Sequence, residues 1–105
     1  MAGVMDGFDR LQVPAGAIAD LCREFGVVEL SAFGSVLRTD FGPESDVDLL
    51  VVFEPGRPVG LFHMLRLQQR LAALLRRPVD LVPKAGLKPL IRDAVLESAR
   101  LLYAA

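Results

Sequence analysis

The chain has 105 residues, close to the most common domain size, so we expect a single domain spanning residues 1–105. Its composition is 52% hydrophobic and 24% charged, which is typical of a globular protein and excludes a disordered or low-complexity chain. No apolar run approaches the roughly 18 residues of a membrane span, and Asp6 and Asp9 lie where a signal peptide carries basic residues. We therefore expect a cytoplasmic domain with no membrane contact, in which part of residues 1–13 is poorly ordered.

The net charge of −1 hides an uneven distribution of charge along the chain. Residues 1–54 contain ten acidic and three basic side chains, whereas residues 55–79 contain five arginines and no acid. These are Arg57, Arg66, Arg70, Arg76 and Arg77. They form either a solvated helix face or a docking surface for an acidic protein or RNA. Aromatic residues do not alternate with them, so direct binding of nucleic acid is not expected.

The order of periodic segments predicts an α/β fold with a small mixed sheet. An apolar stripe at helical spacing predicts a helix over residues 14–25 that ends at Gly26. Further patterns predict strands over residues 27–33, 46–53 and 78–82, and helices over residues 59–76 and 87–96, with a short helical turn over residues 36–40. Residues 100–103 form either a helical turn or a terminal strand. The short link between the first two strands favours an antiparallel pair.

Two of the predicted helices carry apolar faces that we expect to be buried. In residues 59–76 the inward positions are Leu61, Met64, Leu65, Leu71, Ala72 and Leu75. In residues 87–96 they are Leu90, Ile91, Ala94 and Val95.

Asp46 and Asp48 are one residue apart at the start of the second predicted strand. Side chains two residues apart lie on the same face of a strand, so both carboxylates point the same way. Two close carboxylates repel each other unless a cation neutralises them, and oxygen ligands of this kind suit Mg²⁺. An Asp-rich turn before an ordinary strand is the alternative.

Gly34 and Ser35 precede this pair by ten residues, at the end of the first predicted strand. Glycine lets the backbone come close to a phosphate, and serine offers a hydroxyl and an N–H at the start of a short helical segment. The sequence therefore predicts a metal-dependent phosphate site. The prediction rests on a Gly-Ser pair that is followed after ten residues by Asp-x-Asp, with apolar strands on both sides.

These residues resemble the signature of the DNA polymerase β-type nucleotidyltransferases, and most closely that of the minimal nucleotidyltransferase family. The resemblance covers about residues 27–103 and implies a DNA polymerase β-like fold. It departs from the family pattern at Thr39, where glycine is usual. Arg38 matches the family and is expected either to contact the triphosphate or to pair with Asp40 or Glu44. Ser45 also matches, either as a nucleotide-binding residue or as a turn residue.

Asp80 interrupts the third predicted strand, between Val79 and Leu81. A fully buried carboxylate needs a partner, and Asp80 can join the first two acids if the third strand lies beside the second. The alternative is an edge-strand aspartate at a solvated end. The resemblance implies the same, since family members carry a third acid in this context. It further implies that Asp46 and Asp48 hold two Mg²⁺ ions and that Asp80 binds one of them and helps to deprotonate the nucleophile.

The resemblance also implies a reaction and a partner. Gly34 and Ser35 would hold the β- and γ-phosphates of ATP while a hydroxyl attacks the α-phosphate. Many minimal nucleotidyltransferases are antitoxins that transfer AMP to a tyrosine of a small helical HEPN-type toxin. Transfer to a small molecule such as an aminoglycoside, and a non-catalytic partner-binding module, are the alternatives. The oligomeric state and the preferred base are left open by the sequence.

His63 is the only histidine of the chain. No second histidine or cysteine lies at metal-ligand spacing from it, so a zinc site is not expected. It is either a solvated helix residue or a catalytic base.

Overall fold

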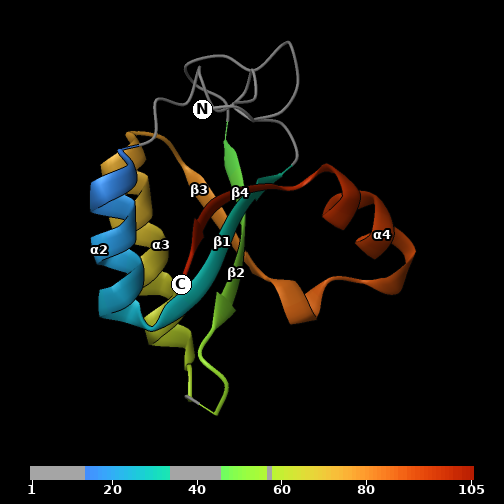
Figure 1. The fold of residues 1–105 in the computed structure, drawn as a ribbon, viewed down its shortest axis with the longest axis horizontal. Helices are drawn as coiled ribbons and strands as arrows, with labels where there is room; N and C mark the ends of the chain where they lie inside the picture. Colours follow the sequence, from blue (N-terminus) through green and yellow to red (C-terminus); the bar gives the residue numbers. More distant parts are fainter. Residues whose placement is uncertain (1–13, 34–45, 57) are drawn as a thin grey trace.

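The computed structural model describes residues 14–33, 46–56 and 58–105 (Figure 1). The short helical turn expected at residues 36–40 and the partial disorder expected at residues 1–13 lie outside this range. In chain order the described elements are α2 (Ala15–Phe25), β1 (Val27–Phe33), β2 (Val47–Phe53), α3 (Leu61–Leu75), β3 (Val79–Pro83), the 3-10 helix η2 (Lys84–Gly86), α4 (Pro89–Ser98) and β4 (Arg100–Ala104).

The strands form a mixed four-stranded sheet in the order β3-β2-β1-β4. Strand β1 is antiparallel to both β2 and β4, whereas β2 is parallel to β3. The mixed sheet and the antiparallel first pair are as predicted, and the terminal segment forms a strand rather than a helical turn. The hairpin of β1 and β2 therefore lies in the middle of the sheet, with one strand from the second half of the chain on each side.

Helices α2 and α3 lie side by side over one face of this sheet (Figure 1). Their apolar stripes meet alternate residues of the strands, and these two layers enclose the core. Its fully buried members include Ile18 and Cys22 of α2, Leu30 and Leu49 of the sheet, and Leu67 and Leu71 of α3. Each large apolar side chain buried in this way contributes roughly 2 kcal/mol to folding.

Glycine and proline fix where the helices begin and end. Helix α2 ends at Gly26, whose φ of 75° lies in the left-handed region that glycine adopts without strain. Helix α3 begins after Gly60, two residues later than the sequence pattern predicts. Helix α4 begins at Pro89, also two residues later, because proline suits the first turn of a helix.

The prediction of which helix faces are buried was partly wrong. In α3 the buried residues are Leu67, Leu71 and Leu75, whereas Leu61 is 71% exposed and Leu65 is also exposed. The fully buried stripe thus begins at Leu67, whereas Met64 and Ala72, also expected to face inward, are half-buried and pack against the core.

Helix α4 departs further from the prediction. It has no buried residue, and Leu90, expected on its inner face, is 98% exposed. Figure 1 shows the reason: α4 lies on the opposite side of the sheet from α2 and α3 and stands away from it.

Candidate active site

The predicted carboxylates lie at one end of the sheet, where β2 and β3 both begin. The parallel register of these strands pairs Asp48 with Asp80. The hydrogen bond from the Val47 N–H to the carbonyl oxygen of Pro78, 2.9 Å long, fixes the same register at the start of the pair. Paired residues of neighbouring strands present their side chains on the same face, so these two carboxylates lie beside each other.

Asp46 lies immediately before β2 and is exposed, as is Asp80, whereas Asp48 is half-buried. Asp48 also pairs with Phe33, the last residue of β1. A row of three paired residues, Asp80, Asp48 and Phe33, therefore crosses this end of the sheet on the face opposite to α2 and α3. We call this face the open face.

The residues present fit a hard divalent cation in kind, because carboxylate oxygens are the ligands that Mg²⁺ prefers. In the described part of the chain, no three His, Cys, Asp or Glu side chains come together closely enough to hold a metal ion. The register brings Asp48 to Asp80, and the convergence of all three acids on two ions stays a prediction.

Four of the predicted nucleotide-binding residues lie outside the described residues. These are Gly34, Ser35, Arg38 and Ser45. Strand β1 ends at Phe33, beside Asp48, so the chain leaves the sheet toward Gly34 directly next to the acids. The phosphate-binding role of these four residues stays a prediction.

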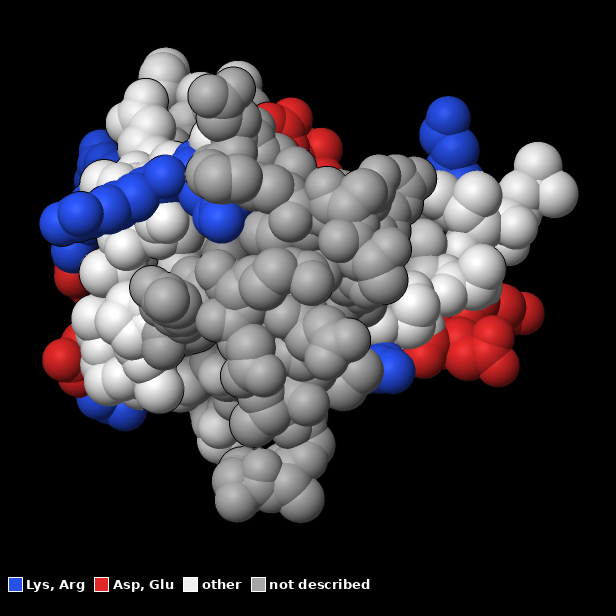
Figure 2. Space-filling view, turned by 90° about the horizontal axis from the view of Figure 1, so that it is seen from above, with Lys and Arg blue, Asp and Glu red and all other residues white. Residues whose placement is uncertain are grey.

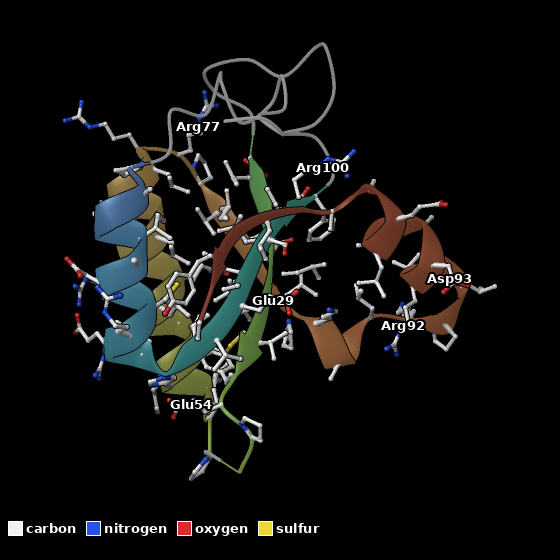
Figure 3. All side chains as sticks on the ribbon, in the orientation of Figure 1. Glu29, Glu54, Arg77, Arg92, Asp93 and Arg100 are labelled. Atoms are coloured by element: carbon white, nitrogen blue, oxygen red, sulfur yellow. The ribbon has the colours of Figure 1, made fainter. Side chains whose placement is uncertain are left out.

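Figure 2 looks onto this end of the molecule: basic side chains are most prominent on the side of α2 and α3, where acidic ones also lie, and the side of α4 carries a group of acidic side chains together with basic ones. Arg77 lies at this end, just before β3 (Figure 3). Another member of the arginine-rich segment, Arg70, lies on the outer surface of α3, where it forms a bidentate ion pair with Glu24 at 3.1–3.2 Å and lies over the ring of Phe25. At least one arginine of the segment therefore ties α3 to α2.

His63 is neither a solvated residue nor placed near the acids. Its Nε2 lies 2.8 Å from the carbonyl oxygen of Phe25. Its ring is packed against the rings of Phe25 and Phe53, with centroids 5.1 and 5.6 Å away. Phe53 is the last residue of β2 and Asp48 is near its start, so His63 lies at the far end of the strand from the acids. Its role is to join α3 to the end of α2.

Among the described helices, none combines the length and the apolar character needed to cross a lipid bilayer.

Residues 16–102 match the model of the family described as nucleotidyltransferase domain. The chain is 43% identical over 77 residues to the protein adenylyltransferase MntA of Thermococcus cleftensis, a match that covers 73% of this chain and 76% of that protein.

Solved structures agree with this family. A structure described as a putative minimal nucleotidyltransferase superposes with a TM-score of 0.70 at 41% identity, covering 90% of this chain and 94% of that one. A crystal structure of a toxin-antitoxin with AMP-PNP superposes with the same TM-score of 0.70. Its identity is 22%, over 89% of this chain and 75% of that one, so this second likeness shows the fold alone. The DNA polymerase β-like fold predicted from the sequence is thereby confirmed, and the chain belongs to the nucleotidyltransferase domain family, in which it groups with the MntA-like protein adenylyltransferases.

Proposed function

We propose that this protein transfers AMP from ATP to a tyrosine hydroxyl of a small HEPN-type toxin and acts as the antitoxin of that partner. The observation that carries the proposal is the strand register that pairs Asp48 with Asp80, in a chain that belongs to a nucleotidyltransferase family. A close pair of carboxylates suits Mg²⁺, which proteins usually hold by one or two carboxylates together with the phosphates of the substrate.

In the proposed reaction the acceptor oxygen forms a bond to the α-phosphorus, and the bond from that phosphorus to the oxygen bridging to the β-phosphate breaks. The acceptor hydroxyl loses its proton and pyrophosphate leaves. Asp80 lies at the exposed edge of the acid row, from which it accepts that proton or orients the hydroxyl. Asp48, further inside the sheet, would hold a cation that supplies positive charge next to the α-phosphate.

Asp46, Asp48 and Asp80 would together hold two Mg²⁺ ions, with Gly34 and Ser35 against the β- and γ-phosphates and with Arg38 and Ser45 as further nucleotide contacts. Such ions neutralise the charge that develops on the attacking and leaving oxygens. The protein's own contribution is then mainly positioning, because the reacting groups are held in line on a rigid sheet.

A protein acceptor is favoured by the relative from Thermococcus cleftensis, which is named as a protein adenylyltransferase and shares 43% identity with this chain. The toxin-antitoxin structure with AMP-PNP has the same fold, which supports ATP as the donor. We propose that the whole chain forms one catalytic domain and that the reaction takes place in the cytoplasm.

The test of this proposal is transfer of label from α-³²P-ATP to the co-encoded neighbouring protein in the presence of Mg²⁺. We expect Asp48→Asn and Asp80→Asn to lower the rate at least about a hundredfold, as when one group that stabilises developing charge is removed. Mass spectrometry of the acceptor should show additions of one or more AMP units on tyrosine.

Asp93→Asn is the matched control, because Asp93 is an exposed residue of α4 and its replacement changes the net charge by the same amount. This variant should keep the wild-type rate. Equal activity of wild type, Asp48→Asn and Asp80→Asn would contradict the mechanism. Labelling of a small molecule such as an aminoglycoside in place of the protein would contradict the proposed acceptor.

A further inference from the structure

The open face of the sheet carries a hollow of about 240 Å³ that lies under α4. Its floor consists of one residue from each of three neighbouring strands, namely Leu50 of β2, Ser31 of β1 and Leu101 of β4. These residues are paired with one another across the sheet. Leu96 and Ala99, at the end of α4, form the wall. The lining of the hollow is thus mixed, with four aliphatic and three polar residues, and the hollow lies between α4 and the sheet.

The hollow is continuous with the acid row. Leu50 follows Asp48 by two residues on β2, and Ser31 precedes Phe33 by two residues on β1, so the floor is the next row of side chains on the same face. Two residues of a strand span about 7 Å. In a nucleoside triphosphate only the ribose separates the α-phosphate from the base. A nucleotide whose α-phosphate lies at Asp48 therefore has its base within reach of the hollow.

The end of the hollow away from the acids is polar. Glu29 and Lys84 both line it, and they form an ion pair of 3.3 Å between the Lys84 Nζ and the Glu29 Oε2. Figure 3 shows Glu29 on the side of the sheet that faces α4. The two side chains are 37% and 35% exposed, and an ion pair this exposed contributes little to stability. Both side chains can therefore break this ion pair and bind a ligand with little loss of free energy.

The apolar lining and the two charged groups of the hollow together suit one nucleobase, adenine. The aliphatic side chains of the floor and the wall offer apolar contact to a flat ring, and a volume of 240 Å³ is smaller than the roughly 300–1,000 Å³ of pockets that hold a whole drug-sized ligand. A carboxylate accepts a hydrogen bond from an exocyclic amino group, and an ammonium group donates one to a ring nitrogen. Adenine presents its amino group and a ring-nitrogen acceptor side by side.

We propose that this hollow receives the adenine ring of ATP, with Glu29 accepting from the 6-amino group and Lys84 donating to an adjacent ring nitrogen. This inference rests on the proposed function and adds to it the residues that select the base. A purine with a carbonyl oxygen at position 6 places a hydrogen-bond acceptor, instead of a donor, opposite the Glu29 carboxylate. Inosine triphosphate, which differs from ATP at that position, is consequently bound more weakly.

The test is calorimetric binding of three probes to the full chain with Mg²⁺ and without acceptor: ATP, inosine triphosphate and inorganic tripolyphosphate. Ala99→Phe fills the hollow and should weaken ATP binding at least about tenfold while leaving tripolyphosphate binding unchanged. Glu29→Gln removes the charged acceptor and should reduce the preference for ATP over inosine triphosphate by about tenfold, as expected for one hydrogen bond to a charged group.

Two variants are matched controls. Ala73→Phe makes the same change at an exposed position of α3, on the other side of the sheet, and Glu97→Gln makes the same charge change on α4 outside the hollow. The proposal is overturned if Ala99→Phe binds ATP as Ala73→Phe does, or if Glu29→Gln keeps the base preference of Glu97→Gln. Unchanged ATP affinity in Ala99→Phe with a raised KM for the acceptor protein also overturns it, because the hollow then serves the acceptor.

The same measurements separate this inference from the proposed function. If the wild-type chain binds ATP and tripolyphosphate equally well, the triphosphate site stands and the base site fails. If it binds neither probe, the proposed function fails and the base site with it.

Discussion

Asp80 illustrates how the position of one side chain depends on the pairing of strands. Along the sequence it lies 32 residues from Asp48, and only the parallel register of β2 and β3 brings the two together. A shift of that register by one residue would turn Asp80 toward α3 and away from Asp48, because strand side chains alternate between faces. The candidate site is therefore sensitive to any change that alters how β3 pairs.

Cys22 shows a residue whose chemistry is suppressed by its surroundings. It is fully buried in the core, and this burial raises the pKa of its thiol from 9.0 to about 11, a shift that the nearby Arg23 guanidinium reduces only in part. The thiol is therefore neutral at physiological pH and unreactive toward alkylating reagents in the folded state. Nothing in the site requires it.

The raised pKa predicts a loss of stability at alkaline pH. Because the folded state holds the thiol proton more tightly than the unfolded state, the stabilisation is complete below pH 9 and is lost as pH rises toward 11. Over that window we expect the free energy of unfolding of the wild type to fall by about 2–3 kcal/mol more than that of Cys22→Ala. Urea unfolding of both proteins at several pH values measures the difference, and parallel curves would contradict the prediction.

At the scale of single elements, helix α3 has an unfavourable end. It is capped by Arg76, whose φ of 57° and ψ of 41° place it in the left-handed region. Glycine adopts this conformation without strain, whereas the same conformation costs a residue with a Cβ roughly 1–2 kcal/mol. Arg76 is the one described residue other than glycine with a positive φ.

We expect Arg76→Gly to raise the free energy of unfolding by about 0.5–1 kcal/mol, since the relief of strain exceeds the added entropy of the unfolded chain. Arg76→Ala serves as the control, because it removes the same charge and keeps the strain. Thermal unfolding of the three proteins compares them. If Arg76→Gly and Arg76→Ala unfold at the same temperature, the conformation of this cap does not limit stability.

The bounds of the elements could be predicted well from the sequence, because Gly26 and the proline-rich link after Phe53 interrupt apolar runs of clear period. Which helix faces are buried could not be predicted from the sequence. Leu71 and Leu90 both belong to predicted apolar stripes at helical spacing, yet one is fully buried and the other almost fully exposed. Periodicity indicates which residues share a face, and only the position of the helix against the sheet decides whether that face is covered.

At the scale of the whole molecule this difference gives a direct test of where the core lies. Leu67→Ala removes a fully buried side chain between α3 and the sheet and should cost about 2–5 kcal/mol of unfolding free energy. Leu90→Ala makes the same chemical change on α4 and should cost no more than about 0.5 kcal/mol. Denaturant titration of the two variants and the wild type measures these differences in the free energy of unfolding. A large loss in Leu90→Ala would mean that α4 packs against the body of the protein in solution.

The candidate site was predictable in the same partial way. The Asp-x-Asp pair and the later acid could be found in the sequence, because each breaks an apolar strand pattern. Ser31 and Glu29 could not be found, since a polar residue on a strand is ordinary in sequence, and Lys84 could be placed near the site only by its position just after the third strand. They acquire a shared position only through the sheet order and the separation of α4 from the sheet.

The central place of the β1-β2 hairpin has a consequence for how the protein is destroyed. Its two outer neighbours, β3 and β4, both come from the second half of the chain, so a single proteolytic cut between β2 and α3 separates the middle of the sheet from both of its borders. After one nick in that connection, the two parts of the chain are therefore held together only by the pairing of β1 with β4 and of β2 with β3 and by the core packing. If these parts separate, the outer edges of β1 and β2 are left uncovered, and exposed edges promote aggregation.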